Sequence, residues 1–342
     1  MRSLRTAIIG CGAHARSVHG PSLMRCASER AGVHLAAACD LDAARAERFA
    51  REFGFAAAYA DIDRMLEREK PDALLLVVPP EKTCDVACRM LERGIPLLME
   101  KPPGMDEAET DRMIAAADRG RAPHMVAVNR RFMPLVRALK ERLDAEPAGG
   151  IHHIDYEFVR VNRRDRDFST TAIHGIDAVR FLAGADYASV RFTFQPAAEA
   201  PPASNVFMDG IMTNGVTVRL RFLPVSGALV ERATVYAADR MYELRMAIPR
   251  GLDGAGRLRC LERYAVKEEI SGPGADGDGL VEAAGVYGEN AAFLDALSDG
   301  RAPYPDLSAI RQSVAVTACF RARRPEYCED NQGERTCRFQ LR

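Results

Sequence analysis

The chain has 342 residues, of which 47% are hydrophobic and 28% are charged, and its formal net charge is −1. This length is sufficient for two domains with separate cores, and the composition is that of an ordinary globular protein. The near-neutral charge gives no electrostatic reason to expect a nucleic-acid partner, and no apolar run reaches the roughly 18–20 residues of a membrane helix. We therefore expect neither nucleic acid nor membrane as a partner. The first apolar run is too short for a signal peptide, which favours a cytoplasmic location.

The cysteine pattern favours free thiols over a disulfide framework. There are nine cysteines, an odd number, and several of them, including Cys11 and Cys39, stand in apolar surroundings. Cys84 and Cys88 are one helical turn apart, but no second Cys/His pair lies nearby in the sequence. We therefore expect no metal site.

Residues 1–124 alternate short apolar runs with segments of helical spacing. The runs are at 6–10, 33–39, 73–78, 96–99 and 124–128, and the helical segments are Ala43–Glu52, Ile62–Arg68, Cys84–Arg93 and Asp106–Arg119. Gly54, Gly94 and Gly120 follow helical segments, and we predict that each is the left-handed C-terminal cap of its helix. The alternation predicts βαβ units, and hence a doubly wound α/β domain with a parallel sheet.

Residues 125–342 follow a different pattern, typical of an α+β domain. Helices are predicted over Pro134–Leu143, Ala172–Leu182, Tyr287–Ser298 and Asp306–Ala322, and strands over Ile151–Val161, 188–195, 204–209, 216–223, 231–237 and 241–247. Many consecutive strands separated by turn signals predict a mostly antiparallel sheet.

A glycine-rich turn follows the first apolar run. Gly10 permits the tight turn, Gly12 lets the backbone approach a pyrophosphate, and the small Ala15 allows close helix–strand packing. Ala13 and His14 complete the turn, and the amino end of the next helix would supply partial positive charge. The turn predicts a dinucleotide site in a Rossmann domain at residues 1–124.

Asp40 ends the second apolar run and is the predicted ribose ligand. A carboxylate there accepts hydrogen bonds from ribose hydroxyls and repels a 2′-phosphate. Asp42 adds to this repulsion, and Leu41 stands where an arginine would bind the phosphate, so NAD is favoured over NADP. The alternative is that Asp40 only caps the following helix. The long gap between Gly12 and Asp40 requires residues 20–32 to form an extended helix or loop.

Lys101 ends a short apolar run that closes in Glu100-Lys101-Pro102. Proline stops strand pairing, so the lysine is placed at the carboxyl edge of the predicted sheet. Ligands of open α/β sheets bind at that edge. Glu100 and Lys101 are therefore predicted to lie at the cofactor.

With Gly10-x-Gly12-x-x-Ala15, Asp40 and Glu100-Lys101-Pro102 in this order, the chain resembles the glucose–fructose oxidoreductase / inositol dehydrogenase / rhizopine catabolism (Gfo/Idh/MocA) family. The resemblance runs from about residue 5 to about residue 322 and includes Asn129-Arg130-Arg131-Phe132 and Ile173-His174-Gly175-Ile176-Asp177. It implies a second domain with an open sheet that often forms a dimer interface, and assembly as a homodimer or homotetramer. It also implies that Lys101 contacts substrate and nicotinamide, and that the Lys101–Pro102 bond is cis.

The sequence departs from this family at two places. Many members carry Asp-x-x-x-His, and the aspartate position here is Thr170. The Thr/Ser-Pro-Asn turn that lies over the cofactor in many relatives is replaced by Val78-Pro79-Pro80, of which Pro79 is retained as a cofactor contact, and its downstream histidine position is Thr83.

The resemblance and the chemistry together assign roles. Oxidation of an alcohol needs a base, for which His174 is the candidate, with Asp177 on the same helix face to orient it. The alternative is that His174 is a core histidine. Lys101 would stabilise the developing alkoxide, and the alternative is a structural pair with Glu100. Arg131, Asn162 and Thr170 are predicted, from position, to contact the substrate.

These features predict an NAD-dependent oxidoreductase that transfers a hydride between nicotinamide and a secondary alcohol or ketone of a sugar, polyol or related small molecule. Two alternatives stay open. Some relatives cleave glycosidic bonds through transient oxidation with the same lysine and histidine. Others are non-catalytic, dinucleotide-sensing regulators. Retention of Lys101 and His174 argues against the regulator, and Thr170 favours it slightly.

Overall fold

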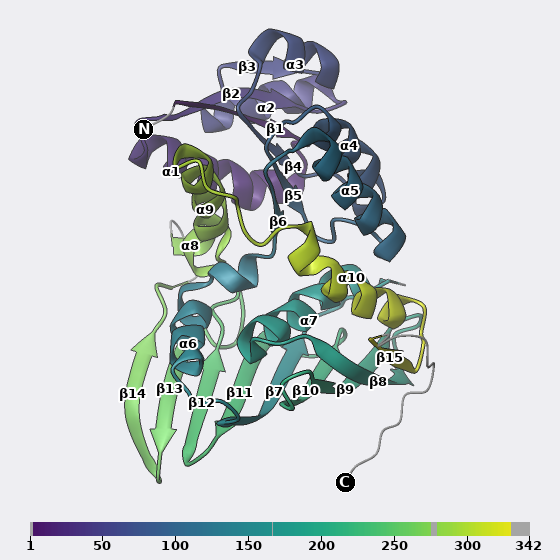
Figure 1. Cartoon of the computed structure of the whole chain (residues 1–342), viewed down its shortest axis with the longest axis vertical. Coiled ribbons are helices and arrows are strands. Elements are labelled where there is room, and N and C mark those ends of the chain that lie inside the picture. The colour runs from purple at the N-terminus through teal and green to yellow at the C-terminus, as the bar shows by residue number, and fades with distance from the viewer. Residues whose placement is uncertain (1–2, 166, 275–278, 330–342) are drawn as a thin grey trace. The chain divides into compact units, whose positions relative to one another are not determined.

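The computed structural model describes residues 3–165, 167–274 and 279–329 (Figure 1). The chain forms two compact units, and each is made of two separate segments. The first unit is Met1–Phe132 with Leu280–Val314, and the second is Met133–Gly279 with Ala315–Arg342. The units therefore do not follow a single cut at residue 124. The predicted roles of the two domains, cofactor binding for the first and substrate binding and oligomerisation for the second, stay predictions.

The first unit is built on a six-stranded parallel sheet. Its strands are β1 (Leu4–Ile9), β2 (Val33–Cys39), β3 (Ala57–Tyr59), β4 (Ala73–Leu76), β5 (Leu97–Glu100) and β6 (His124–Ala127), in the spatial order β3-β2-β1-β4-β5-β6. The predicted doubly wound fold is confirmed. The strand order reverses between β1 and β4, and ligands of such sheets bind at this point, outside the carboxyl ends of the strands.

Helices connect these strands. They are η1 (Ala15–His19), α1 (Gly20–Glu29), α2 (Ala43–Phe53), α3 (Ile62–Glu69), α4 (Pro80–Glu92), α5 (Glu107–Gly120) and η2 (Asn129–Phe132). Asp42, Asp61 and Asp106 cap α2, α3 and α5, because each side chain accepts a hydrogen bond from the N–H three residues on. Helix α1 covers most of residues 20–32, which agrees with one of the two predicted options for the long gap before Asp40.

The predicted cap at Gly120 is wrong. Gly54 and Gly94 do have left-handed backbones, with φ of 79° and 71°, but Gly120 is the last residue of α5, and Arg121 takes the left-handed conformation with φ of 50°. The glycine is needed for packing instead. A Cβ at residue 120 would lie 1.8 Å from the carbonyl oxygen of Leu91.

The second unit is built on a nine-stranded sheet in the order β14-β13-β12-β11-β7-β10-β9-β8-β15. Its strands are β7 (Ile151–Val159), β8 (Tyr187–Pro196), β9 (Ser204–Met212), β10 (Thr217–Leu223), β11 (Val230–Ala237), β12 (Arg240–Arg245), β13 (Arg257–Glu262), β14 (Ala265–Ser271) and β15 (Glu326–Cys328). Among the described strands of this sheet, only β7 and β10 pair in parallel, so the predicted mostly antiparallel sheet is confirmed. Helices α6 (Pro134–Asp144) and α7 (Ser169–Ala183) pack against this sheet, and α10 (Leu307–Arg321) spans the boundary between the units.

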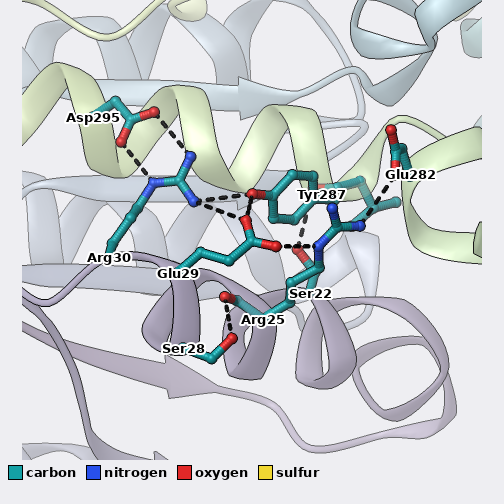
Figure 2. A network of polar contacts seen from close by, with 9 residues as sticks. Ser22, Arg25, Ser28, Glu29, Arg30, Glu282, Tyr287 and Asp295 are labelled. Atoms are coloured by element: carbon teal, nitrogen blue, oxygen red, sulfur yellow. Dashed lines mark hydrogen bonds and ion pairs between the residues drawn. The ribbon is translucent and has the colours of Figure 1, made fainter. Parts of the chain in front are cut away.

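Helices α8 (Leu280–Ala283) and α9 (Val286–Ser298) follow β14 in sequence but belong to the first unit. Figure 2 shows the polar network that fixes α9 to α1. The Arg30 guanidinium donates to both carboxylate oxygens of Asp295, at 2.7 and 3.1 Å, and to the Tyr287 hydroxyl at 3.0 Å. The Arg25 guanidinium lies 4.1 Å from the centre of the Tyr287 ring and pairs with Glu282 at 3.1 Å. This network, together with apolar packing, explains why α9 joins the first unit.

No helix in the described ranges is both long enough and apolar enough to cross a membrane. Most of the described cysteines are free, as predicted, and Cys11, Cys26, Cys39, Cys84 and Cys319 are buried. Cys328 departs from the prediction, because it is disulfide-bonded.

Candidate functional site: the carboxyl edge of the parallel sheet

The glycine-rich turn follows β1, as predicted. Gly10 has φ of +94°, and a Cβ there would lie 2.0 Å from the carbonyl oxygen of Val77, so only glycine fits. A Cβ at Gly12 would meet nothing within 4 Å, which leaves its backbone open to a ligand. Ala15 is fully buried at the start of η1. The turn therefore meets the steric requirements of a dinucleotide site.

Asp40 lies directly beyond β2 and is tied to the glycine-rich turn. The Cys11 N–H donates to Asp40 Oδ2 at 2.8 Å, and the Asp42 N–H donates to Asp40 Oδ1 at 2.9 Å. The alternative that Asp40 caps the next helix does not hold, because Asp42 is the N-cap of α2. Leu41 is 93% exposed.

A cleft of about 700 Å³ lies over this turn. Its lining comes from the turn and from η1 and α2, and consists of Cys11, Gly12, Ala13, Arg16, Arg45, Arg48, Phe49, Arg51 and Glu52. The four arginines were not predicted as site residues. Arg45 Nη1 lies 3.3 Å from Asp40 Oδ1, so part of this positive charge is paired. Backbone donors, an open glycine and a cationic cleft fit the adenosine and pyrophosphate part of a dinucleotide.

Pro79, Glu100 and Lys101 lie at the same edge. Pro79 is the N-terminal flanking residue of α4 after β4, Glu100 ends β5, and Lys101 follows it. The Lys101–Pro102 bond is cis, as the resemblance implied. The Glu100 carboxylate accepts a hydrogen bond from the Lys101 backbone N–H at 3.1 Å, and two histidine side chains contact its Oε1 atom.

Glu100 accepts hydrogen bonds from His14 and His19. Both Nε2 atoms lie near Glu100 Oε1, at 3.0 Å for His14 and 2.8 Å for His19. Burial alone would raise the pKa of Glu100, but these two hydrogen bonds lower it well below its usual value. Among the described residues, this trio has its ligand atoms close enough for a metal ion. Direct hydrogen bonds account for the contacts, and we assign no metal.

The remaining predicted residues are divided between the units. Arg131 lies in η2 of the first unit and is buried. Asn162, Thr170, His174 and Asp177 belong to the second unit. Thr170, His174 and Asp177 all lie on α7, where positions three and four apart share a face. Asp177 is buried, and Thr170 and His174 are half-buried. Asn162 is exposed, and its side chain accepts a hydrogen bond from Arg164.

Two further residues of the first unit, besides the four cleft arginines, were missed by sequence reasoning. His19 is almost fully buried and contacts Glu100, and Glu289 in α9 is fully buried near Glu100 and Lys101. His19 stands five residues after His14, which gave a weak signal. Glu289 gave no sequence signal, because it lies in the segment 280–314, far in sequence from the rest of the first unit.

The first unit thus has the fold and the glycine-rich turn of a dinucleotide-binding domain, and Gly10, Asp40 and Glu100 lie at the carboxyl edge of its sheet. Residues 4–128 match the model of the "Oxidoreductase family, NAD-binding Rossmann fold". This match supports the resemblance to the Gfo/Idh/MocA family in the segment that carries the glycine-rich turn, Asp40 and Glu100-Lys101-Pro102. An inositol 2-dehydrogenase of Corynebacterium glutamicum is 27% identical over 200 residues, which are 56% of this chain and 58% of that protein. A myo-inositol dehydrogenase of Streptomyces leeuwenhoekii is 26% identical over 201 residues, 55% of this chain and 58% of that protein. The chain therefore spans less than two thirds of these relatives.

Solved structures share the fold over nearly the whole chain. A dehydrogenase from Chromobacterium violaceum superposes with a TM-score of 0.80 at 21% identity, covering 93% of this chain and 94% of that one. An oxidoreductase from Agrobacterium radiobacter, solved in complex with NAD+, L-tartaric acid and magnesium, gives a TM-score of 0.76 at 17% identity, covering 92% and 94%. At these identities the likeness concerns the fold alone.

Proposed function

We propose that the protein is an NAD-dependent oxidoreductase that transfers a hydride between nicotinamide and a secondary alcohol or ketone of a sugar, polyol or related small molecule. The observation that carries this proposal is the placement of Gly10, Asp40 and Lys101 after β1, β2 and β5, at one edge of the parallel sheet. The names of the inositol dehydrogenases to which the chain is similar support the substrate class.

In the proposed reaction the alcohol loses a hydride from carbon and a proton from oxygen. Bound NAD supplies the hydride acceptor. The glycine-rich turn, Asp40, Leu41 and Pro79 would hold it. The Lys101 ammonium would donate a charge-assisted hydrogen bond to the substrate oxygen and stabilise the developing alkoxide.

His174 would take the hydroxyl proton, with Asp177 on the same helix orienting its ring. Arg131, Asn162 and Thr170 are the proposed contacts to the remainder of the substrate.

A screen of sugars, polyols and amino sugars with NAD, followed at the nicotinamide absorbance, tests the reaction. Stoichiometric NADH supports a dehydrogenase. Sugar release without net NADH would indicate the glycoside-cleaving alternative, and neither product would indicate a regulator. Sedimentation of the whole protein would test the proposed homodimer or homotetramer.

We propose NAD rather than NADP as the cofactor, because the Asp40 carboxylate would accept a ribose hydroxyl and repel a 2′-phosphate. Replacing Asp40 with alanine removes one of the two carboxylates near the Arg45 guanidinium, the one at 3.3 Å, and leaves only the 3.4 Å contact with Asp42 to compete with a phosphate. Asp40→Ala is expected to shift the ratio of NADH to NADPH affinity by about tenfold or more toward NADPH. Titration of both cofactors into wild type, Asp40→Ala and the surface control Asp85→Ala measures this ratio. Tighter binding of NADPH by the wild type would overturn the assignment.

A carboxylate introduced at residue 170 should interact with the His174 side chain, because the two positions are four apart on α7. In Thr170→Asp, the new negative charge favours imidazolium and raises the pKa of the histidine. We expect the acidic limb of the pH–rate profile to move up by roughly one unit, about 1.4 kcal/mol of interaction. Thr170→Asn is the uncharged control. An active Thr170→Asp variant with an unmoved limb would show that residue 170 does not act on the base.

A further inference from the structure

Glu289 occupies a fixed position in the first unit. It lies in the first turn of α9, and the Arg30–Asp295 and Arg25–Tyr287 contacts of Figure 2 hold this helix on α1. The neighbouring residue Asn290 is buried, and its amide donates to the Ser22 hydroxyl at 2.9 Å. The helix also packs against η1 and η2. The Glu289 carboxyl is therefore held where it is by the fold.

The environment of this carboxyl is unusual. Glu289 has 0% exposure, and neither of its carboxyl oxygens has a hydrogen-bond partner among the described residues. An ionised carboxylate without hydrogen bonds is strongly disfavoured in a protein interior, so such a group takes up a proton instead.

One charged neighbour of Glu289 strengthens this effect, and two others oppose it. Burial raises its pKa well above the usual value, the negative charge of Glu100 raises it further, and Arg130 and Lys101 act in the opposite direction. Of the elements packed against α9, η1 brings His19, η2 brings Arg130 and Arg131, α8 brings Glu282 and β6 brings His124. The charged groups at α1 are paired, Arg25 with Glu29 and Glu282 and Arg30 with Asp295. Glu100 and Glu289 are thus two neighbouring carboxyl groups whose pKa values are shifted in opposite directions. In such a pair one carboxyl group is ionised and the other keeps its proton.

We propose that Glu289 is a positioning residue for Lys101: a buried carboxyl group that keeps its proton, so that the ammonium charge of Lys101 stays available to the substrate oxygen. The role of Lys101 rests on the proposed function. If Glu289 were ionised, its carboxylate would compete with the substrate oxygen for the same cation. The negative charge at this edge is instead carried by Glu100 and directed to His14 and His19.

The first test is independent of activity. A carboxyl whose pKa is raised in the folded protein destabilises the fold as the pH rises above its unfolded value of about 4.3, and the loss grows until the pH reaches the folded value. Glutamine at residue 289 has the same shape and cannot ionise. The difference in melting temperature, Glu289→Gln minus wild type, should therefore become more positive between about pH 5 and pH 8, by about 2 °C or more.

Glu282→Gln is the matched control for the melting experiment. Glu282 is 42% exposed and paired with Arg25, so its melting difference should not become more positive with pH. If the difference for Glu289→Gln becomes more negative as the pH rises, Glu289 is ionised and paired, and the proposal is overturned. A difference that does not change with pH overturns it too, because Glu289 would then titrate alike in the folded and unfolded chain.

The second test separates positioning from a purely structural role. In the wild type, the proposed active form has a proton on both Lys101 and Glu289. Activity falls at high pH when either group loses its proton, so the basic limb of the pH–rate profile depends on both. In Glu289→Gln only the Lys101 route remains, so this limb should move to higher pH. An unmoved limb in an active variant would remove Glu289 from the site, even if the melting result holds. A wild type without turnover on any substrate would contradict the proposed function, and the melting series would still decide where the proton resides.

Discussion

Replacing Lys101 with methionine is expected to lower turnover by roughly a hundredfold or more, in line with removing one electrostatic stabiliser of a developing oxyanion. Methionine keeps most of the apolar stem and removes the ammonium group. NAD binding should change little, because the turn at Gly10 and the Asp40 carboxylate lie after other strands. Steady-state kinetics with the best substrate of the screen, combined with NADH titration, measures both quantities.

Lys267→Met is the control for this substitution, since Lys267 is an exposed lysine on β14 in the second unit. It should behave as wild type. Near-normal turnover in Lys101→Met would mean that the Glu-Lys-Pro lysine has a structural role in this protein. Loss of both turnover and NADH binding would place Lys101 in cofactor binding rather than in stabilisation of the substrate oxygen.

Replacing His174 with alanine should remove the proposed general base, and a loss of turnover of about a hundredfold or more is expected. The acidic limb of the pH–rate profile should disappear with it. His152→Ala is the control, because His152 is an exposed histidine on β7 of the same unit. Survival of the acidic limb in His174→Ala would show that another group, for which Lys101 is the first candidate, carries the proton.

The fold could be predicted to the extent that residues repeat with a clear period. The apolar runs that became β1, β2, β4, β5 and β6 are buried on both faces of a parallel sheet, so they appear as continuous apolar stretches. Strand β3 has only three residues and was missed. Strands β13 and β14 were missed because they are rich in Arg, Lys and Glu, and β14 is almost entirely exposed. Their pairing follows from neighbouring strands and not from an apolar pattern of their own.

The site could be predicted where a local motif places a residue at a strand end. Gly10, Asp40 and Lys101 follow β1, β2 and β5, as the apolar runs indicated. Contacts over long sequence distances gave no comparable signal. His19 and Glu100 are 81 residues apart, and Glu289 is brought near Glu100 by the packing of α9 on α1, η1 and η2. The opposite pKa shifts of Glu100 and Glu289 therefore depend on tertiary structure.

The return of α9 to the first unit also affects how the protein can be made. Phe293, Leu294 and Leu297 belong to the same buried cluster as Leu4 and Ile8. During synthesis, the ribosome must therefore complete the whole 133–279 segment before the nucleotide-binding core can close. Multidomain chains generally fold their N-terminal domain first as it emerges. Here the first unit must wait for residues 280–314, and the core of the second unit must wait for Val316, Cys319 and Phe320, so neither unit is complete when its first long segment leaves the ribosome.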